Sequence, residues 1–322
     1  MNETQKQVYL FLKQNGFTPV DVSTYSLLCE YEDDTHIYDR TATLTSTWAF
    51  AVNALYRIIN GYLCYAEFSW ETVNMEIRYS QNIKNCLLKE TIDVLYGLAK
   101  EAGLETLRIW NVEYRRKPEY EAVSGYEIKC EYSEDHSDYE YRVEDLVDLN
   151  GTVNYYKRRR IKKYQSDPLV SFAPVTKASF SACFDALNEW CRHKDGFSET
   201  DCDLCGAIPG CGCIRTGLAG MERIFNEEKF GGLVASYAGK PVGFAIWEYR
   251  NGGYVFVFYA QSAMTNLNIY LYYTMAKERL FDKKYINPGG NGGDEGLRVF
   301  KSHLGAHKRV HKYIFTFLKK DV

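Results

Sequence analysis

The sequence predicts an α+β protein made of two layered domains, each with a mixed central sheet flanked by helices. Its 322 residues exceed what one hydrophobic core usually supports, so two domains of about 150 residues are expected. Strands alternate with helices in the first half, which favours an α/β layer. In the second half, turns at 239–241 and 251–253 separate three short apolar runs, a spacing typical of an antiparallel meander.

The first half is expected to alternate between helices and strands. Apolar residues recur at helical spacing over residues 3–15, 47–59 and 88–103. Strands are expected at residues 62–70, 106–110, 126–132 and 138–143, and the last two could pair with each other. We assign residues 1–150 to an N-terminal domain, 151–166 to a basic connecting helix and 167–322 to a C-terminal domain.

In the second half, turn residues separate the predicted elements more clearly than in the first. Helices are expected at residues 179–192, 217–228 and 265–280. Strands are expected at residues 231–237, 242–249, 254–259 and 284–287. The predicted order is therefore helix, helix, three-stranded meander, helix and strand.

Composition limits the partners and the compartment. A formal net charge of −3 argues against a general nucleic-acid binder, so any RNA contact must use a local patch. Ten cysteines, with neither a basic leader nor an apolar core at the N-terminus, indicate a reducing cytoplasm. No uncharged apolar run reaches the roughly 18 residues that span a bilayer. We therefore expect a soluble, cytoplasmic protein.

A glycine-rich stretch near the C-terminus is the leading candidate site. The sequence Asn291-Gly292-Gly293-Asp294-Glu295-Gly296-Leu297-Arg298-Val299-Phe300-Lys301 follows the last expected strand. Glycines permit positive φ and close backbone approach. If a helix begins here, Asp294, Arg298 and Lys301 fall at i, i+4 and i+7 and project from one face. Such a face could hold a polar, anionic substrate; the alternative is a turn followed by a solvated helix.

Three stretches resemble one family. Ile286-Asn287 followed by Gly293-Asp294-Glu295-Gly296-Leu297-Arg298 and Lys301 resembles the closing motif of the phosphatidylglycerol lysyltransferase C-terminal-domain family. Residues 144–151, leading into 156–159, are similar to that family's junction between halves, and residues 239–245 to its central hairpin. The resemblance implies two tandem domains of the GNAT acyltransferase fold. In the best-known members it implies transfer of an aminoacyl group from aminoacyl-tRNA to a lipid, and we expect this chain to lack the membrane region of full-length relatives.

The acyl donor is inferred by comparing the second half of the chain with GNAT domains, because the two share the same order of helices and strands. An ordinary GNAT acetyltransferase binds the CoA pyrophosphate on backbone amides of a glycine loop at a helix N-terminus. The corresponding residues 260–266 contain no glycine. Acyl-CoA is therefore the second choice of donor, after aminoacyl-tRNA. An aminoacyl ester is already activated, so the enzyme would align the nucleophile, accept a proton and stabilise the oxyanion.

Five residues are candidates for catalysis. Arg298 or Lys301 could steady an anion or bind a phosphate, and Asp294 could orient the amine or accept a proton. Tyr259 and Glu248, from adjacent strands, are further candidates. The substrate is expected to contact the loop through Asn291, Gly293 and Gly296.

The stretch Lys157-Arg158-Arg159-Arg160-Ile161-Lys162-Lys163 is the strongest basic run of the chain. One hypothesis is that Lys157, Arg158 and Arg159 contact the phosphates of tRNA or of a nucleotide tail. The alternative is a solvated connecting helix whose aliphatic stems cover apolar surface.

Four cysteines, Cys202, Cys205, Cys211 and Cys213, lie close together on a loop rich in glycine. Four thiolates could bind zinc or hold an iron–sulfur cluster. The second pair follows sooner than in a standard zinc ribbon. A thiol-rich loop, either reduced or reversibly disulfide-bonded, is the alternative.

These inferences converge on a soluble tandem-GNAT transferase that moves an aminoacyl group from aminoacyl-tRNA to an amine or hydroxyl acceptor, including a lipid headgroup. The alternatives are an acyl-CoA-dependent N-acyltransferase and a non-catalytic ligand-binding module of the same fold. No resident cofactor is implied beyond these donors and the possible metal at the cysteine loop. The acceptor, the amino acid and the oligomeric state stay open.

Overall fold

The computed structural model describes residues 1–21, 24–25, 29, 54–69, 72–78, 87–193 and 214–320. The chain forms two compact units, each with its own sheet. The first unit is built mainly from residues up to Ser137 together with the C-terminal residues from Val310. The second unit is built mainly from the residues between Asp138 and Arg309. These ranges differ from the expected division at residues 150 and 167, because the chain end returns to the first sheet.

The first unit contains a seven-stranded sheet with the order β1-β2-β3-β4-β5-β14-β6. Its strands are β1 (Thr18–Pro19), β2 (Ala54–Ile59), β3 (Tyr62–Ser69), β4 (Thr72–Arg78), β5 (Leu107–Glu113), β6 (Tyr126–Tyr132) and β14 (Lys312–Lys319). Neighbours are antiparallel except for β4 and β5, which run parallel. Its helices are α1 (Glu3–Gln14), α4 (Leu88–Glu101) and α5 (Lys117–Glu121).

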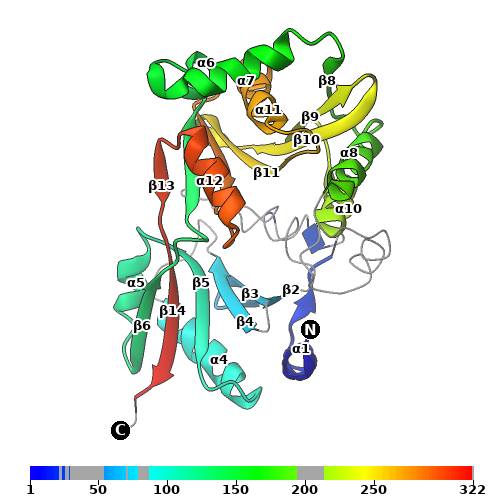
Figure 1. Cartoon of the computed structure of the whole chain (residues 1–322). Coiled ribbons are helices and arrows are strands. Elements are labelled where there is room, and N and C mark those ends of the chain that lie inside the picture. Colours follow the sequence, from blue (N-terminus) through cyan, green and yellow to red (C-terminus); the bar gives the residue numbers. More distant parts are fainter. Residues whose placement is uncertain are drawn as a thin grey trace. The chain divides into compact units, whose positions relative to one another are not determined.

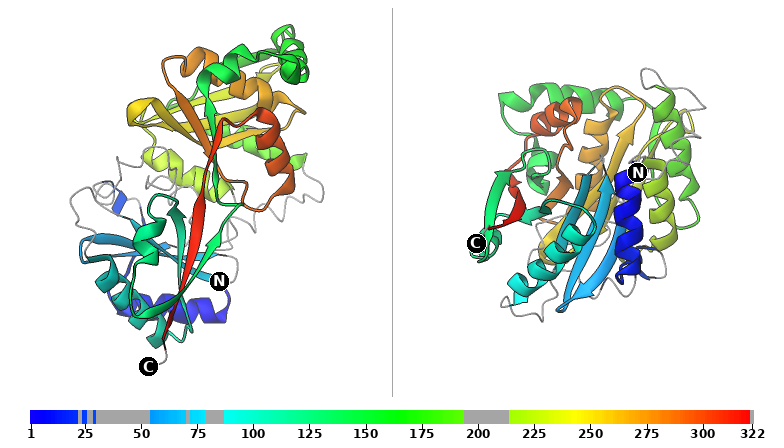
Figure 2. Two further views of the ribbon diagram at one scale, coloured as in Figure 1. Left: turned by 90° about the vertical axis from the view of Figure 1, so that its left-hand side faces the viewer. Right: turned by 90° about the horizontal axis from the view of Figure 1, so that it is seen from below.

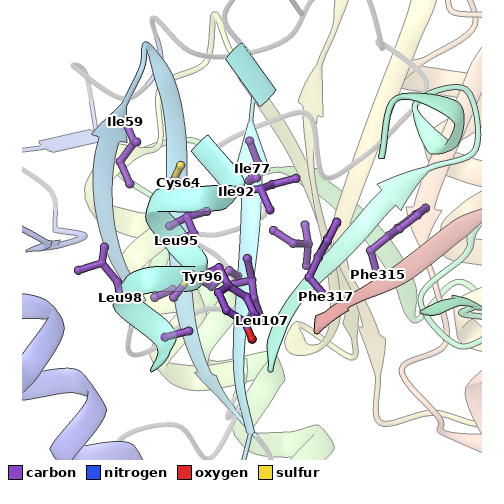
Figure 3. Packing of buried hydrophobic residues seen from close by; sticks show 14 of the residues in the cluster. Ile59, Cys64, Ile77, Ile92, Leu95, Tyr96, Leu98, Leu107, Phe315 and Phe317 are labelled. Atoms are coloured by element: carbon purple, nitrogen blue, oxygen red, sulfur yellow. The ribbon is translucent and has the colours of Figure 1, made fainter. Parts of the chain in front are cut away.

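One face of this sheet packs against α1 and α4. A reciprocal capping box between Asn2 and Gln5 starts α1. The apolar stripe of α4 includes Ile92 and Leu95, which are both fully buried. Figure 3 shows these side chains packed beside strand residues of the same core, and the figure includes Phe317 from the C-terminal strand β14. The C-terminal strand β14 therefore packs into the same core as the N-terminal helix α1.

The second unit contains a seven-stranded sheet with the order β13-β7-β12-β11-β10-β9-β8. Its strands are β7 (Asp138–Arg142), β8 (Val170–Pro174), β9 (Phe230–Tyr237), β10 (Lys240–Tyr249), β11 (Tyr254–Ser262), β12 (Tyr285–Gly289) and β13 (Lys308–Val310). The predicted meander is confirmed as β9, β10 and β11, and β12 lies parallel to β11. Helices in this part of the chain are α6 (Val143–Asp148), α7 (Tyr155–Gln165), α8 (Ser181–Arg192), α10 (Ile214–Ile224), α11 (Leu267–Thr274) and α12 (Glu295–Leu304).

The two sheets repeat one topology. In each, a meander leads through a helix to a parallel strand, and the place beyond that strand is taken by a strand from elsewhere in the chain. In the first unit this strand is β14, drawn in red between β5 and β6 (Figures 1 and 2). In the second unit it is β7, which pairs with β12. The expected pairing of residues 126–132 with 138–143 is therefore wrong, since β6 and β7 belong to different sheets.

The helix expected at residues 47–59 is also wrong over its described part. Residues 47–53 lie outside the described residues, and Ala54–Ile59 forms strand β2. The two-residue turn Asn60-Gly61, with φ of 50° and 83°, joins β2 to β3. An Asn-Gly pair is the strongest short-range signal for such a hairpin, and it outweighs the helical spacing of the apolar residues.

Candidate functional site

The glycine-rich loop lies between β12 and α12 in the second unit and is shaped by its own side chains. Asn287 Oδ1 accepts a hydrogen bond from the N–H of Gly289 at 2.7 Å. Asn291 Oδ1 accepts one from the N–H of Gly293 at 2.8 Å. Gly289, Gly292 and Gly293 have φ of 76°, 61° and 82°, a region that residues with a Cβ rarely adopt. The glycines are thus required by the backbone path of the loop.

Lys301 holds this loop against α12. Its side chain is buried, at 5% exposure. The ammonium donates to the carbonyl oxygens of Pro288 at 2.8 Å and Gly289 at 3.1 Å, and to that of Gly290. A buried ammonium needs such acceptors, because an unsatisfied charge in the interior is costly. Lys301 therefore binds the inner side of the loop. The prediction that Lys301 and Arg298 project from one face of the helix is wrong.

Asp294 and Arg298 lie at the exposed start of α12. Asp294 is the N-cap, and its Oδ1 accepts from the N–H of Leu297 at 2.7 Å. The Arg298 guanidinium binds Glu295 through two contacts, Nε to Oε2 at 2.7 Å and Nη2 to Oε1 at 2.8 Å. Gly296 sits in the first turn, where an added Cβ would lie 3.3 Å from Asp294 Oδ1. The predicted helix start is confirmed, but the charge of Arg298 is already balanced by its neighbour.

Two buried polar atoms beside the loop lack hydrogen-bond partners among the described residues. They are Nδ2 of Asn291, a residue that is 3% exposed, and the hydroxyl of Tyr139, a residue that is 2% exposed. Tyr139 lies on β7 opposite Gly289. Its ring is 3.8 Å from the Arg309 guanidinium and 5.8 Å from Lys301 Nζ, measured to the ring centroid. These atoms can donate hydrogen bonds to a carbonyl, carboxylate or oxyanion of a ligand.

Tyr139 and Arg309 were not identified from the sequence. Tyr139 comes from a strand about 150 positions before the loop in the sequence, and no local pattern links the two. Asn291, in contrast, was predicted as a binding residue from its place in the loop. The structure gives its amide a definite geometry, with the oxygen used inside the loop and the nitrogen left for another group.

Glu248 and Tyr259 are not brought to this loop. Trp247, beside Glu248, belongs to the same apolar cluster as Leu304 of α12. Since successive side chains of a strand alternate between faces, Glu248 points to the opposite face. There it is fully buried, with Lys229 Nζ at 3.6 Å and Arg250 Nη1 at 3.5 Å. Tyr259 is also buried and packs against Phe244, with ring centroids 6.1 Å apart.

The basic run forms α7, as expected, but its cations are used in two ways. Lys157 Nζ donates to the carbonyl of Leu304 at 2.9 Å, which caps α12, and burial lowers the pKa of Lys157. Arg158 donates to the carbonyl of Leu149 at the end of α6, and to that of Gly151 at 2.8 Å. Two of the three predicted phosphate ligands thus hold backbone carbonyls.

The remaining polar side of α7 faces solvent. We define the α7 basic face by six of its exposed residues, namely Tyr155, Tyr156, Arg159, Arg160, Lys162 and Lys163. Arg158 is exposed too, but it is left out of this face because its guanidinium donates to two backbone carbonyls. The opposite side of the helix buries Ile161 and Tyr164. No carboxylate occurs on α7 itself. Of the predicted triad, Arg159 alone contributes to this face.

The N-terminus of α11, where an acetyltransferase would bind pyrophosphate, is already hydrogen-bonded. The Tyr164 hydroxyl donates to the carbonyl of Thr265 at 2.6 Å, which joins α7 to this turn. Backbone N–H groups that already donate to protein acceptors are those of Ala263, Met264, Leu267 and Ile269. Pyrophosphate binding at a helix N-terminus needs several such groups in the open.

The four cysteines of the predicted metal loop, 202, 205, 211 and 213, lie outside the described residues. Within the part of the chain that is described, no group of three or more histidine, cysteine or acidic side chains could hold a metal ion. Cys64 and Cys183 are both buried. Among the described helices, none is long and apolar enough to cross a bilayer.

Comparison with known proteins gives similarity in structure. Neither a family model nor a curated protein matches the sequence. A conserved protein of unknown function from Bacteroides thetaiotaomicron has a TM-score of 0.72 and 18% identity, covering 94% of this chain and 99% of its own. The C-terminal domain of a putative lysylphosphatidylglycerol synthetase from Agrobacterium fabrum has a TM-score of 0.59 and 11% identity, covering 89% and 91%. L-PGS from Bacillus licheniformis has a TM-score of 0.56 and 13% identity, covering 98% and 92%.

The chain has the tandem GNAT-like fold. Each of its two units has a mixed sheet flanked by helices, as the sequence predicted. The structures that share this fold include the lysylphosphatidylglycerol synthetase domain to which the closing motif pointed. At these identities the likeness concerns the fold, so the reaction must be argued from the residues of this chain.

Proposed function

We propose that this protein transfers an aminoacyl group from aminoacyl-tRNA to an amine or hydroxyl acceptor. The observation that carries the proposal is the α7 basic face. In a chain of net charge −3, four exposed cations besides the carbonyl-bound Arg158 gather on one helix that contains no acid. Cations clustered in this way attract a phosphate backbone and release its counterions.

The aromatic residues on this face support RNA as the polyanion. Tyr155 and Tyr156 are 54% and 68% exposed, although tyrosine more often buries its ring. Exposed aromatic rings beside Arg and Lys side chains are what single-stranded nucleotides stack on. A charged tRNA carries its aminoacyl ester on a single-stranded 3′ end, so one surface could hold both its backbone and its unpaired bases.

The glycine loop is the proposed place of chemistry. An ester carbonyl gains negative charge on its oxygen when an amine or hydroxyl attacks it. The Asn291 amide and the Tyr139 hydroxyl are buried donors that could stabilise this oxygen. Asp294, Arg298 and Glu295, at the exposed start of α12, are then placed to bind the polar parts of the substrates. Lys301 acts as a positioning residue that keeps the loop in shape.

Binding of tRNA tests the first half of this proposal. Four phosphate contacts predict that the logarithm of the dissociation constant rises by about 3 for each tenfold rise in salt. Changing Arg159 and Lys163 to alanine should halve that slope and weaken binding. The matched control replaces two exposed lysines of the first unit, Lys13 and Lys100, by alanine and should leave the slope unchanged. Equal effects of the two double variants would contradict a specific role of α7.

Turnover tests the second half. Incubation with tRNAs charged with single amino acids, and with amine or hydroxyl acceptors, should accelerate acceptor-dependent deacylation. Asn291→Ala should slow it by about a hundredfold to a thousandfold, the order seen when one oxyanion donor is lost. Binding without turnover for every charged tRNA would favour a non-catalytic binding module. Turnover with acyl-CoA in place of charged tRNA would overturn the choice of donor.

A further inference from the structure

A cluster of ionisable side chains lies on the sheet of the first unit, on the face opposite the core formed with α1 and α4. Cys64 and Ala66 of β3, and Met75 and Ile77 of β4, point into that core. Because neighbouring side chains alternate along a strand, the intervening residues point to the other face. They are Tyr65, Glu67, Asn74, Glu76 and Arg78. All of them except Glu67 are less than 9% exposed, and Glu67 is partly exposed.

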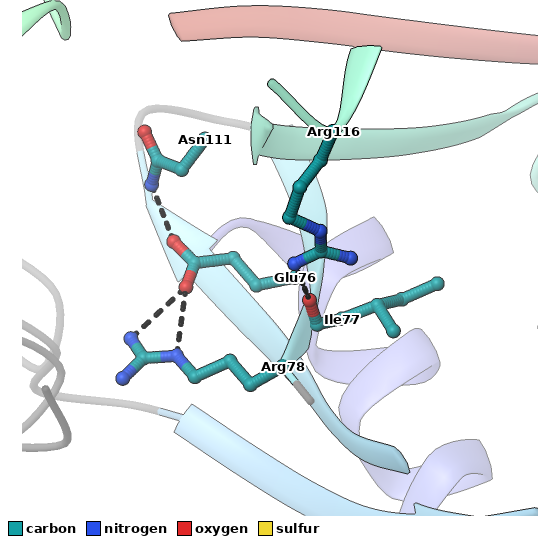
Figure 4. Close-up of polar contacts among 5 residues, drawn as sticks. All are labelled: Glu76, Ile77, Arg78, Asn111 and Arg116. Carbon is teal, nitrogen blue, oxygen red and sulfur yellow. Dashed lines mark hydrogen bonds and ion pairs between the residues drawn. The ribbon is translucent and has the colours of Figure 1, made fainter. Parts of the chain in front are cut away.

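Glu76 and Arg78 form a neutral pair within this cluster (Figure 4). Arg78 donates to Glu76 Oε2 from Nη2 at 3.0 Å and from Nε at 3.3 Å. Asn111 of β5 donates its Nδ2 to the other oxygen, Oε1. The Arg78 guanidinium also lies over the Tyr65 ring, 4.8 Å from the centroid. Both oxygens of Glu76 thus accept hydrogen bonds from neighbouring side chains.

Asn111 reaches Glu76 through an unusual backbone conformation. Its φ is 57°, in the left-handed region, which asparagine tolerates better than other residues with a Cβ. The register between β5 and β14 shifts at this point, as expected for a bulge that redirects a side chain. The parallel strands β4 and β5 are joined in register only at Met75 and Ile109. The fold therefore directs an amide onto Glu76 close to this registered pair.

Glu67 is the second carboxylate of the cluster. Asn74 lies directly opposite Glu67 across β3 and β4, and Glu76 lies diagonally beside it. Among the described residues of β3 and β4 on this face, two carry carboxylates and one carries a guanidinium, which is bound to Glu76. Burial, together with the negative charge of Glu76, raises the pKa of Glu67 to about 8, although Arg78 opposes the shift. Among the described residues, no hydrogen bond or ion pair gives Glu67 a cation of its own.

We propose that Glu67, beside the Glu76–Arg78 pair, binds the amino group of a small ligand as an alkylammonium ion. A primary ammonium supplies the missing positive charge and up to three N–H donors. On binding, the Glu67 carboxyl group releases its proton to solvent and becomes the carboxylate partner of the ammonium.

Calorimetry of the full-length protein tests the site. n-Butylamine and ethanolamine are titrated at pH 7 in two buffers of different ionisation enthalpy, with 1-butanol as the neutral analogue of the first. The expected result is amine binding with close to one proton released per amine, and no binding of 1-butanol. Glu67→Gln, which has nearly the shape of the protonated side chain, should weaken amine binding at least tenfold. Glu127→Gln, on the exposed side of β6, is the matched control and should bind as the unaltered protein does.

Four outcomes would overturn the proposal. They are amine binding that Glu67→Gln leaves unchanged, equal binding of 1-butanol, binding without proton release, and no binding of either amine. The proton count is measured on the unaltered chain, so it remains valid even if the variant folds poorly. No step involves tRNA. A protein that binds amines in this way but deacylates no charged tRNA would contradict the proposed function and leave the amine site standing.

Discussion

Replacing Lys301 by methionine is expected to loosen the glycine loop more than any other single change on α12. The variant keeps the aliphatic stem but removes the ammonium that holds three carbonyl oxygens. Hydrogen bonds to a charged group contribute about 1.5–3 kcal/mol each. Relief from burying the charge offsets a large part of that sum. We expect the free energy of unfolding to fall by about 3 kcal/mol, the size of effect seen when a buried charged network is broken.

The assay is denaturant unfolding combined with hydrogen exchange. The amide of Gly293, which donates to Asn291 inside the loop, should exchange faster in Lys301→Met. Arg298→Ala is the control on the same helix, because its ion pair with Glu295 is exposed and is expected to contribute less than about 1 kcal/mol. If Lys301→Met lowers stability no more than Arg298→Ala, and Gly293 exchange is unchanged, the loop does not depend on the buried ammonium and our reasoning about it fails.

Three further predictions concern the two cores. Deleting β14 should unfold the first unit, because Phe317 of β14 belongs to a core built mostly from the N-terminal part of the chain. Loss of the far-ultraviolet circular dichroism signal from the remaining chain would show this unfolding. A stable, native-like fragment would contradict it. Cys183, whose pKa burial raises to about 12, should resist thiol reagents at pH 8 until denaturant is added, and rapid labelling of the native chain would count against its burial. Although burial raises the pKa of Asp93, hydrogen bonds from Lys89 and Tyr126 lower it overall. A group whose pKa is lower in the folded state stabilises the protein at pH values above its unfolded pKa, and this stabilisation is lost as the pH falls through the folded pKa. Asp93→Asn should therefore lower the free energy of unfolding by up to about 1 kcal/mol at pH 7 and by less in acid. An equal loss of stability at both pH values would refute this.

Part of the candidate site could be predicted because it depends on short-range chemistry. A run of glycines before Asp294 marks a loop with positive φ and then a helix N-cap, and both are present. The basic run from Lys157 was expected to be helical and forms α7. Turn residues at 239–241 and 251–253 separate the three strands of the second meander. In each case the deciding contacts lie within a few residues of the chain.

The roles of individual charged residues could not be predicted in the same way. Lys301 and Arg298 are three positions apart and look alike in sequence, yet one is buried under carbonyls and the other lies in solvent. Lys157 and Arg158 were expected to bind phosphate but cap the ends of two other helices. A long cationic side chain takes whichever acceptor the fold brings within reach, and that acceptor is usually distant in sequence.

The sequence by itself determined the local elements, the turn positions and the presence of two α+β units, because hydrophobic period and turn chemistry act over a few residues. Tertiary structure alone decided which strands from distant parts of the chain share a sheet. It assigned β14 to the first sheet and β7 to the second, and it placed Tyr139 beside the loop and Glu76 beside Asn111. Strand pairing across such separations follows from which exposed edges and apolar faces remain to be covered once the local elements have formed, and no local pattern in the sequence records that.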